Sequence, residues 1–396
     1  MGWVPMGSRW GAGWGEERHV SLRQWRNLDW PLLGLMLLAA GMGLVAVAGV
    51  TGTGLHDPLV LATLRHQIAY TIVGLVAFVV CASMDYHAWT RWAKPLYVLL
   101  LGLLVVTWRL GHHALGAARW IRVGHFEFQP SEFCKLILIV CLSTWLSPQV
   151  GRLRGWGEII PPTIVAALPA VLVALQPDLG TSLVFAAILV GILFAAGVPG
   201  ERLVLGVALV LGAGIAAVVA HLRWHIHIPI HAYQLNRLLS FLHPQHNAQS
   251  TGYHILQSEM AIGSGRVWGN GLFSMGVNNQ LRYLPESNSD FVFASISDVA
   301  GFVGAAAVLG VLVLSVWRML RCMASARDTL GALLVAGVAA MLGFQTLLNA
   351  AVTLGLTPVT GVPLPFFSVG GSAAVADFLA MGVVQSVCMR RKKIQF

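Results

Sequence analysis

The amino-acid sequence predicts an all-α protein that crosses a membrane about ten times. Composition is the first observation behind this prediction. Hydrophobic residues make up 57% of the 396 positions, charged residues only 10%, and the mean hydropathy is +0.73. The second observation is that apolar runs of about twenty residues, enough to cross a hydrocarbon core of roughly 30 Å, recur along the chain. Lipid offers a polar backbone no hydrogen-bond partners, so each run is expected to be a helix.

Ten such runs follow one another from the N-terminus to the C-terminus. They are expected at residues 31–50, 66–84, 95–110, 132–147, 162–176, 181–197, 203–221, 291–317, 329–353 and 371–389. The spans form one membrane domain over residues 31–389, between an N-terminal tail of residues 1–30 and a basic C-terminus at 390–396. One outer loop, residues 222–290, is far longer than a simple connection, and loops of that length are usually functional.

The basic residues predict the orientation. Most of the 25 Lys and Arg fall in segments that are cytoplasmic if both termini are cytoplasmic, as the positive-inside rule requires. The formal charge of +9 therefore reports topology and contact with anionic lipid. No basic face with interleaved aromatic residues is found, so nucleic acid is not an expected partner.

The cysteines predict no disulfide framework. All five lie in or just inside expected spans: Cys81, Cys134, Cys141, Cys322 and Cys388. No outer loop contains a cysteine, so an outer domain held together by disulfides is not expected.

The long loop of residues 222–290 has features of its own. "AYQLNRLLSFL" and "GYHILQSEMAI" place apolar residues at helical spacing around 235–242 and 253–260. Both predict short amphipathic helices on the membrane surface. "GSGRVWGNGLFSMG" at 263–276 follows. Its glycines are expected to interrupt regular structure and to let the backbone approach a ligand closely.

Carboxyl groups are concentrated where this loop enters the eighth expected span. Asp290 lies at the lip of the span, and Asp298 is eight residues further on, about 12 Å deeper at a helical rise of 1.5 Å per residue. An acid within a span is costly and usually faces a cavity or a partner. Two interpretations of Asp290 are open: a cap for the helix start, or a general base beside apolar residues that desolvate it.

Three further stretches place polar residues at the edges of spans. Glu132 and Lys135 share a helix face at i,i+3, either as a mutual ion pair that makes burial tolerable or as a functional pair. "QPDLGTS" at 176–182 is expected to turn, with Asp178 able to cap the next helix. "TPVTGVPLPFFSVGGS" at 357–372 is either a rigid hairpin or the lining of a cavity. The histidines around "HIHIPIH" have no standard zinc-ligand spacing.

Together these stretches resemble the SEDS family (shape, elongation, division and sporulation), which includes RodA and FtsW. The resemblance runs from Arg65 to the C-terminus through "RHQ", "GAARWI", "FQPSEFCKL", "QPDLGTS", "YQLNRLLSFLHP", "ILQSEMAIGSGRVWGNGL", "LPESNSDFVFA" and "TGVPLPFFSVGGSA". "TGVPLPF" and "NNQLRYLPE" are more similar to the RodA branch than to FtsW. Motifs in one order on a ten-span topology indicate the SEDS fold.

The resemblance implies a peptidoglycan glycosyltransferase that polymerises lipid II at the outer face of the bacterial cytoplasmic membrane, for cell-wall elongation and cell shape. It assigns the essential family aspartate to Asp290. Its implied substrates are lipid II and undecaprenyl-pyrophosphate-linked glycan, and its partners are a class B penicillin-binding protein and other elongation machinery. The implied substrate-binding residues are Arg119, Glu132, Lys135, Asp178, Arg237, Glu286 and Ser368.

The implied mechanism is an inverting glycosyl transfer in which Asp290 removes a proton from the acceptor sugar. The departing pyrophosphate needs positive charge, from Arg119, Lys135, Arg237 or a divalent cation such as Mg²⁺ or Mn²⁺. The sequence does not choose among these sources.

Three positions depart from the family pattern. Asp298 is followed by Val299 where two consecutive glutamates are usual, Val369 replaces a tyrosine, and Arg266 replaces a glycine. A metal site that used the missing glutamate is therefore undetermined.

Three alternatives are open. A lipid II flippase would suit helices broken by proline and buried ion pairs, although no inverted repeat is found. A structural scaffold for a partner enzyme leaves Asp290 and Glu132 unexplained. A division enzyme of the FtsW branch would share the chemistry.

Overall fold

The computed structural model describes residues 25–51, 58–110, 112–114, 117–123, 126–153, 155–224, 237, 240–241, 251–272 and 288–391. Glu286 and the first 24 residues of the N-terminal tail lie outside these ranges. So does most of the first expected surface helix, around 235–242.

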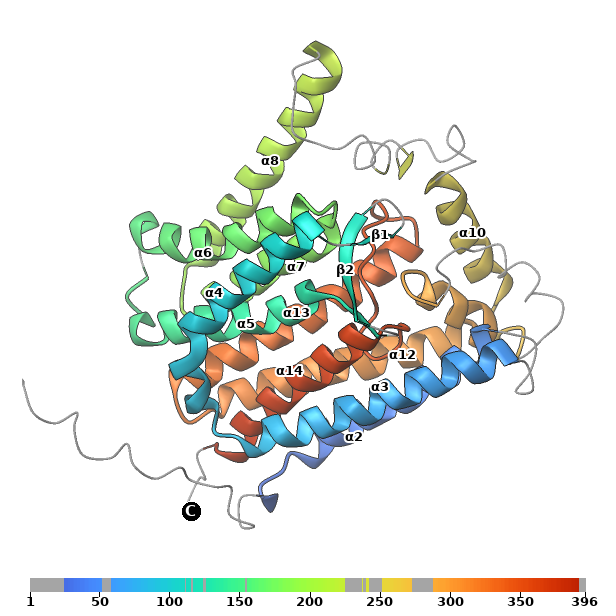
Figure 1. Ribbon diagram of the computed structural model, residues 1–396, viewed down its shortest axis with the longest axis horizontal. Helices are drawn as coiled ribbons and strands as arrows, with labels where there is room; N and C mark the ends of the chain where they lie inside the picture. Colours follow the sequence, from blue (N-terminus) through green and yellow to red (C-terminus); the bar gives the residue numbers. More distant parts are fainter. Residues whose placement is uncertain are drawn as a thin grey trace, which may run out of the picture.

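Ten helices follow the ten expected spans in order (Figure 1). They are α2 (Trp30–Thr51), α3 (Pro58–Ser83), α4 (Tyr86–Leu110), α5 (Pro130–Leu146), α6 (Trp156–Ala174), α7 (Leu179–Ala195), α8 (Gly200–Trp224), α12 (Val292–Ala324), α13 (Thr329–Thr353) and α14 (Gly371–Met389). In the described part of the chain, nine of them are long and apolar enough to cross a membrane, and α7 is a shorter apolar helix. The predicted multi-pass helical fold is confirmed. The second surface helix is also present, as α10 (Thr251–Ser264).

Three helices extend beyond the apolar runs that predicted them. α3 begins at Pro58, before Arg65, and α4 begins at Tyr86, before Lys94. α12 continues to Ala324. Long basic side chains can reach from a helix to water while their stems stay on apolar surface. The backbone therefore remains helical past the point where hydropathy falls.

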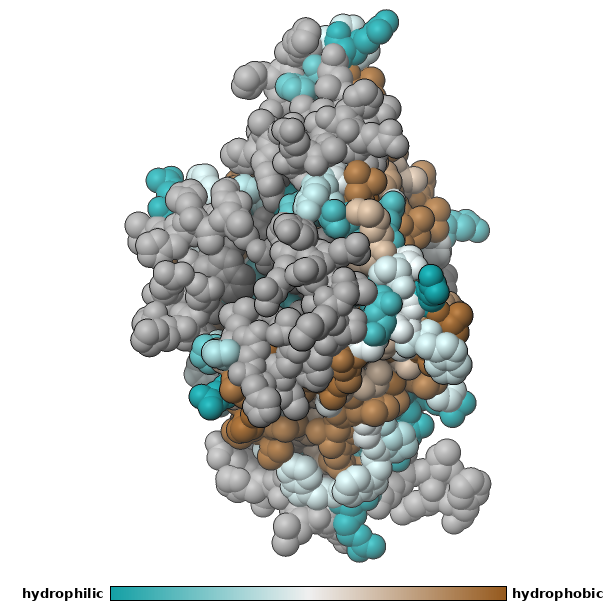
Figure 2. Space-filling view, turned by 90° about the vertical axis from the view of Figure 1, so that its right-hand side faces the viewer, coloured by the Kyte–Doolittle hydropathy of each residue, from teal (hydrophilic) through white to brown (hydrophobic). Residues whose placement is uncertain are grey.

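The centre of the bundle is formed by α13 and α14, most of whose residues are buried. α14 packs along α3, and α13 packs against α12 and α7. α8 is the opposite case, because its most apolar window is fully exposed and the helix projects from the bundle (Figure 1). Figure 2 shows exposed apolar side chains, in brown, beside hydrophilic residues in teal. A helix that is apolar all round without protein covering it is typical of a lipid-facing span.

A small antiparallel sheet, which the sequence did not predict, joins α4 to α5. Its strands are β1 (His112–Ala114), β2 (Ala117–Val123) and β3 (Phe126–Phe128), paired in the order β1-β2-β3. Such short strands contain too few alternations to produce a period-2 pattern. β3 contacts α14 and leads through Gln129 into α5. The sheet therefore lies beside the start of the helix that contains Glu132 and Lys135.

The two ends of the bundle are named here by what they contain. The loop end includes Asp290, α10 and residues 357–372. The tail end is the opposite one, where α2 and α13 begin and α12 and α14 finish.

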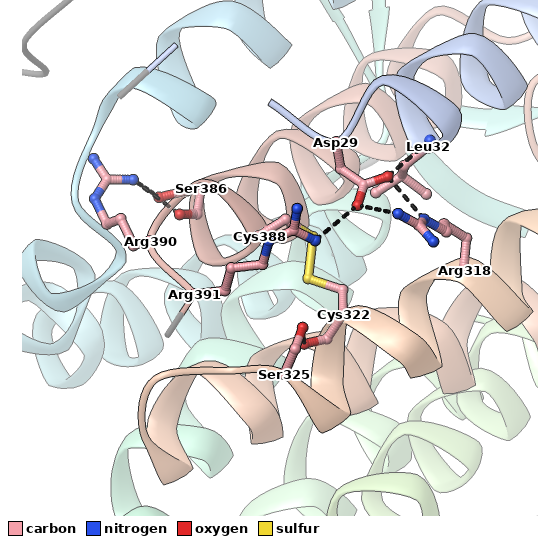
Figure 3. Close-up of a disulfide and its surroundings, with 9 residues drawn as sticks. All are labelled: Asp29, Leu32, Arg318, Cys322, Ser325, Ser386, Cys388, Arg390 and Arg391. Carbon is pink, nitrogen blue, oxygen red and sulfur yellow. Dashed lines mark hydrogen bonds and ion pairs between the residues drawn. A yellow bond between two sulfur atoms is a disulfide. The ribbon is translucent and has the colours of Figure 1, made fainter. Parts of the chain in front are cut away.

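At the tail end, one buried carboxylate connects three elements. Asp29, only 2% exposed, precedes α2 and accepts a 3.1 Å hydrogen bond from Leu32 N. Arg318 of α12 donates to both carboxylate oxygens, at 2.9 and 2.8 Å, and Arg391 Nη1 lies 3.5 Å from Oδ2 (Figure 3). Bidentate pairing of this kind fixes orientation as well as distance.

The same end contains a disulfide bond, so the expectation of no disulfide was wrong. Cys322 of α12 and Cys388 of α14 are joined, with Cα atoms 5.6 Å apart (Figure 3). The prediction considered only outer loops. Two cysteines that are 66 residues apart in sequence meet because α12 and α14 end beside each other, which residue spacing does not reveal.

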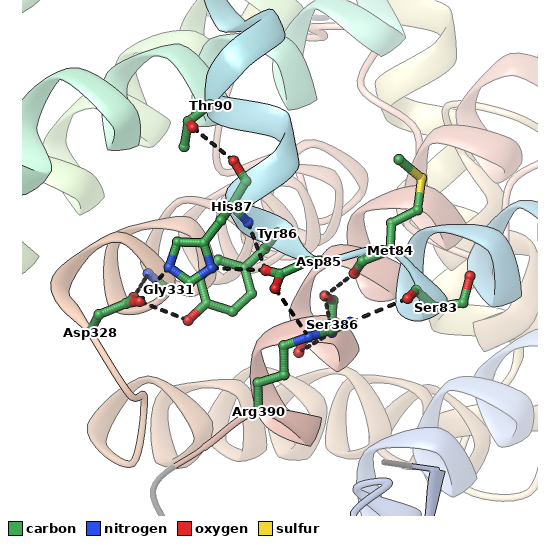
Figure 4. Close-up of polar contacts among 10 residues, drawn as sticks. All are labelled: Ser83, Met84, Asp85, Tyr86, His87, Thr90, Asp328, Gly331, Ser386 and Arg390. Carbon is green, nitrogen blue, oxygen red and sulfur yellow. Dashed lines mark hydrogen bonds and ion pairs between the residues drawn. The ribbon is translucent and has the colours of Figure 1, made fainter. Parts of the chain in front are cut away.

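A second polar cluster links the α3–α4 turn to the α12–α13 turn. His87 lies between two carboxylates, with Nδ1 2.8 Å from Asp85 Oδ1 and Nε2 2.7 Å from Asp328 Oδ2 (Figure 4). Asp328 also accepts from the Tyr86 hydroxyl at 2.9 Å. The hydrogen bond from the His87 side chain lowers the pKa of Asp85 to about 2. Arg390 Nε, 3.9 Å from Asp85, adds a C-terminal contact.

Candidate active site

Asp290 stands at the loop end, in a turn whose backbone is held by other parts of the chain. Its carbonyl oxygen accepts a 2.9 Å hydrogen bond from Asn349 Nδ2 of α13. The carbonyl of Ser289 accepts one of 2.7 Å from Ser368 Oγ. The carbonyl one residue earlier accepts one of 2.8 Å from Val369 N. Three successive carbonyls are therefore held, and they determine where the Asp290 side chain begins.

The structure decides between the two interpretations of Asp290. The N-cap of α12 is Phe291, and no side chain makes a capping hydrogen bond there. The cap interpretation is therefore wrong. Phe291, Val292 and Phe293 are all buried, so apolar packing follows directly on Asp290. That is the environment expected of a carboxyl group used as a general base.

Residues 357–372 form a folded, largely buried loop. The Leu364 N–H donates to Ser368 Oγ at 2.8 Å, and the Ser368 N–H donates to the Leu364 carbonyl at 3.1 Å. Asn349 Nδ2, which holds the Asp290 turn, also donates to the carbonyl of Val362 at 2.8 Å. Non-helical backbone inside a membrane protein needs such internal partners. The loop supports the Asp290 turn, and the Ser368 hydroxyl, predicted to bind substrate, is one of its supports.

Asp178 caps α7, as its position in the turn predicted. Its Oδ1 accepts from Thr181 N at 3.1 Å and its Oδ2 from Thr181 Oγ1 at 2.9 Å. Gly180, in the same turn, lies against the carbonyl of Thr360 and the side chain of Val362, where a Cβ would collide with both. The capped start of α7 therefore fits directly against residues 357–372. The implied contact of Asp178 with substrate stays a prediction.

Glu132 and Lys135 form the predicted ion pair. Lys135 Nζ lies 2.7 Å from Glu132 Oε2, and both side chains are 2% exposed. They occupy the first two turns of α5, whose N-cap Gln129 has its N–H 3.0 Å from Ser372 Oγ at the start of α14. The pair is thus buried between α5 and α14. Buried pairs contribute little net stability, so a role beyond pairing is still needed to explain it.

Two buried polar residues at this end were missed from the sequence. Asp377 of α14 is 4% exposed, accepts a hydrogen bond from the Phe366 N–H and feels the charges of Lys135 and Glu132. Asn349 of α13 is 1% exposed. The rule that singled out Asp298, an acid inside a span, would have found Asp377. Asn349 had no comparable signal, because an amide in a long apolar helix carries no charge.

The remaining predicted residues are only partly described. Arg237 Nη1 donates to the carbonyl of Val359 at 3.0 Å, which ties the long loop to residues 357–372. Arg119 lies in β2, and its side chain is outside the described part of the chain. Glu286 is outside it altogether. Only Arg237, of these three, is placed near the Asp290 support.

The glycine-rich stretch makes a close backbone approach, and its partner is α12. Gly301 interrupts that helix with φ 66° and ψ −165°. A Cβ on Gly265 or Gly269 would collide with the α12 backbone. The N–H groups of Phe302 and Val303 donate to the carbonyls two turns away in residues 266–267, at 2.9 and 3.1 Å. In return, the N–H groups of residues 270–271 donate to the carbonyls of residues 298–299 at 2.9 and 3.0 Å. The groups freed by the helix break are thus paired.

Asp298 fastens the same junction. Its Oδ1 accepts a hydrogen bond from Ser264 Oγ and one of 2.8 Å from Asn270 Nδ2. Arg266, at the position where the resemblance implies glycine, has φ 49°, in the left-handed region that glycine adopts without steric cost. The substitution keeps the backbone shape of a glycine position.

A metal site does not emerge from the described residues, among which no three His, Cys, Asp or Glu side chains are grouped to hold an ion. The Asp298 carboxylate already binds Ser264 and Asn270. The residues present at this junction therefore fit a structural role.

Comparison with known proteins places these features in context. The family model described as cell cycle protein, covering FtsW, RodA and SpoVE, matches residues 29–393. The chain is 33% identical over 368 residues to a probable peptidoglycan glycosyltransferase FtsW of Trichlorobacter lovleyi, covering 91% of this chain and 92% of that one. It is 34% identical over 333 residues to the peptidoglycan glycosyltransferase MrdB of Escherichia coli K12, covering 84% and 87%.

A solved structure is also similar. It comes from work on the structural coordination of polymerization and crosslinking by a peptidoglycan synthase complex. The match has a TM-score of 0.76 and 28% identity, and it covers 91% of this chain and 97% of the other.

Proposed function

The chain belongs to the cell cycle protein family of FtsW, RodA and SpoVE, and from this premise we propose that it is a peptidoglycan glycosyltransferase that polymerises lipid II. Two relatives with that activity in their names cover most of the chain. The observation that carries the proposal is the Asp290 turn. A carboxyl group is held by its own backbone, from α13 and from residues 357–372, next to buried apolar residues.

The transfer joins two lipid-linked sugars at the membrane boundary. Asp290 removes the proton from the 4-hydroxyl of the acceptor N-acetylglucosamine. That oxygen attacks the anomeric carbon of the N-acetylmuramic acid at the lipid-linked end of the growing strand, and undecaprenyl pyrophosphate departs with the bonding electron pair. A positioned base contributes about 10²–10⁴-fold to the rate of such a step. The sugars are in water and the carrier lipid is in the bilayer, so the base belongs at the lip of a span.

Charge for the departing pyrophosphate comes from outside the ion pair. Lys135 is 2% exposed and engaged with Glu132, which leaves it poorly placed to reach a phosphate. Arg237, fixed to the carbonyl of Val359 beside the loop, is the better candidate among the described residues, together with Arg119. Mg²⁺ or Mn²⁺ would supply Lewis-acid charge. No step is routed through a metal here, because the described donor set does not group around one.

The protein acts in the bacterial cytoplasmic membrane with both termini inside, so that the loop end faces outward. The distribution of its basic residues supports this orientation. Its proposed partner is a class B penicillin-binding protein, which would crosslink the strands made here. A similar chain belongs to a complex that coordinates polymerization with crosslinking, and this sequence has no S-x-x-K nucleophile motif of its own. Elongation of the cell wall, as in the RodA branch, is the proposed pathway.

The test is polymerisation by the purified protein alone. Wild-type protein and Asp290→Asn are given lipid II without any other transferase, and products are separated on a gel. The Asn variant keeps the size of the side chain and the backbone contacts of the turn, but it has no base. We expect glycan chains from the wild type and none from the variant.

Each result has one meaning. Strands from Asp290→Asn at a near wild-type rate would overturn the assignment of the base. Lipid II that crosses a bilayer without being polymerised would replace the transferase with a flippase. Neither polymer nor movement would leave a scaffold.

A further inference from the structure

Asp377 is a buried acid that the transfer reaction does not use. It lies in the second turn of α14 and is 4% exposed. Its carboxylate accepts a hydrogen bond from the backbone N–H of Phe366. An acid at this depth is costly and usually has a function. The question is what its contact with Phe366 achieves.

Phe366 is a bend in residues 357–372 with an unusual backbone. Its φ is 67°, in the left-handed region that non-glycine residues seldom adopt. Such a residue persists only when its surroundings hold it. Asp377 binds its N–H, and Gly43 of α2 lies against its carbonyl oxygen. Its ring packs edge-on against Phe378, with ring centroids 5.4 Å apart.

The bend controls the support of Asp290. Two residues after Phe366, the Ser368 hydroxyl donates to the carbonyl of Ser289 at 2.7 Å. The next residue, Val369, donates its N–H to the carbonyl of Asn288 at 2.8 Å. A shift of the bend would therefore move both contacts, and with them the turn that contains the base.

Lys135 explains how a charged Asp377 is tolerated. α5 and α14 begin at one level, because Gln129 N lies 3.0 Å from Ser372 Oγ. At 1.5 Å per residue, Lys135 is about 9 Å and Asp377 about 8 Å from that contact. The charge of Lys135 acts on Asp377 as well as on Glu132. One ammonium group thus serves two buried carboxyl groups, one of which holds the bend.

We propose that Asp377 is a positioning residue for the transfer reaction. Acting with Lys135, it holds the left-handed bend at Phe366, and through Ser368 it sets the place of Asp290. This role rests on the proposed function, with Asp290 as the base. It gives the Glu132–Lys135 pair a purpose beyond stability, since the pair neutralises and locates the acid that orders the loop.

The experiment compares three variants with the wild type. Asp377→Leu removes both the charge and the acceptor for Phe366 N–H, whereas Asp377→Asn keeps an acceptor and removes the charge. Asp29→Asn is the matched control. It makes the same change in a carboxylate of similar burial that is paired with Arg318 at the other end of the bundle. For each purified protein, thermal unfolding is measured, and initial rates of strand synthesis are measured against lipid II concentration, well below every Tm.

A positioning role predicts a loss of kcat rather than a rise in KM. Asp377→Leu should lower kcat about 10²-fold, since small displacements of a reacting group cost that much. Its KM should stay within about threefold of wild type, because substrate binding is not the affected step. Asp377→Asn should lie between, at about tenfold. Asp29→Asn should lower Tm and leave kcat near the wild-type value.

Several outcomes would overturn the proposal. A kcat for Asp377→Leu near that of wild type would show that the bend does not position the base. Should that variant fail to fold, a wild-type kcat in Asp377→Asn would do the same for the charge. An equal loss of kcat in Asp29→Asn would reduce the effect to general destabilisation. The wild type and Asp290→Asn, run alongside, separate these failures from a failure of the proposed function.

Discussion

Lys135 and Glu132 should not be equivalent, although they form one ion pair. Lys135→Met leaves two buried carboxyl groups, Glu132 and Asp377, without their shared ammonium group. An uncompensated buried charge costs about 3–5 kcal/mol. Glu132→Gln leaves Lys135 facing Asp377, so the loss approaches that of one hydrogen bond to a charged group, about 1–3 kcal/mol. The lysine variant should therefore be the less stable by a clear margin.

Thermal unfolding of the two purified variants in the same detergent measures this difference, with lipid II polymerisation assayed in parallel. The swap of the two residues, Glu132→Lys with Lys135→Glu, keeps one charge of each sign and should recover part of the stability. It moves the ammonium group by one helical turn, so activity should stay low. Equal Tm values for Lys135→Met and Glu132→Gln would refute the sharing of Lys135. Unimpaired polymerisation by Glu132→Ala would refute a functional role for the pair.

Three further predictions concern the rest of the molecule. Protein denatured without reductant should show three reactive thiols, and five after reduction, because Cys322 and Cys388 are joined; five thiols without reductant would contradict the bond. Asp85 has its pKa lowered from 3.8 to about 2, so its contribution is present above about pH 4 and lost as pH falls through about 2. Because the group is partly exposed, the contribution is at most about 1 kcal/mol. The Tm difference between wild type and Asp85→Asn should therefore vanish on acidification, and a difference independent of pH would contradict this. Leucine at Gly304 and Ala307 should weaken co-purification of a class B penicillin-binding protein, because small residues on α12 permit close helix approach; an undiminished complex would move the interface elsewhere.

Local patterns predicted what depends on neighbouring residues. Apolar runs gave ten spans in the right order, the i,i+3 spacing gave the Glu132–Lys135 pair, and the turn sequence gave the Asp178 cap. Contacts between distant segments were not predictable in this way. Asn349 reaches a carbonyl 59 residues earlier in the chain, and Cys322 meets Cys388 across two helix ends. The break at Gly301 is paired by residues 266–271, which a hydropathy profile places outside the span.

The site residues divide along the same line. Asp290 was found because an acid next to apolar sequence is unusual wherever it occurs. Its supports were not, since Ser368 and Asn349 are uncharged, and what they do depends on the backbone groups they reach. Asp377 was within reach of the rule for acids in spans, but its meaning comes only from the bend at Phe366.

Stability does not account for the polar groups buried at the loop end. Removing such groups from water offsets most of what their pairing returns. Asn349, Ser368 and Asp377 have in common that they bind backbone groups, and a side chain that binds backbone determines where a segment lies. Two of them act on the turn that contains Asp290, and the third acts on the loop beneath it. Buried polarity here is therefore best explained by the placing of one carboxyl group, and loss of these side chains should affect the rate of transfer more than the integrity of the fold.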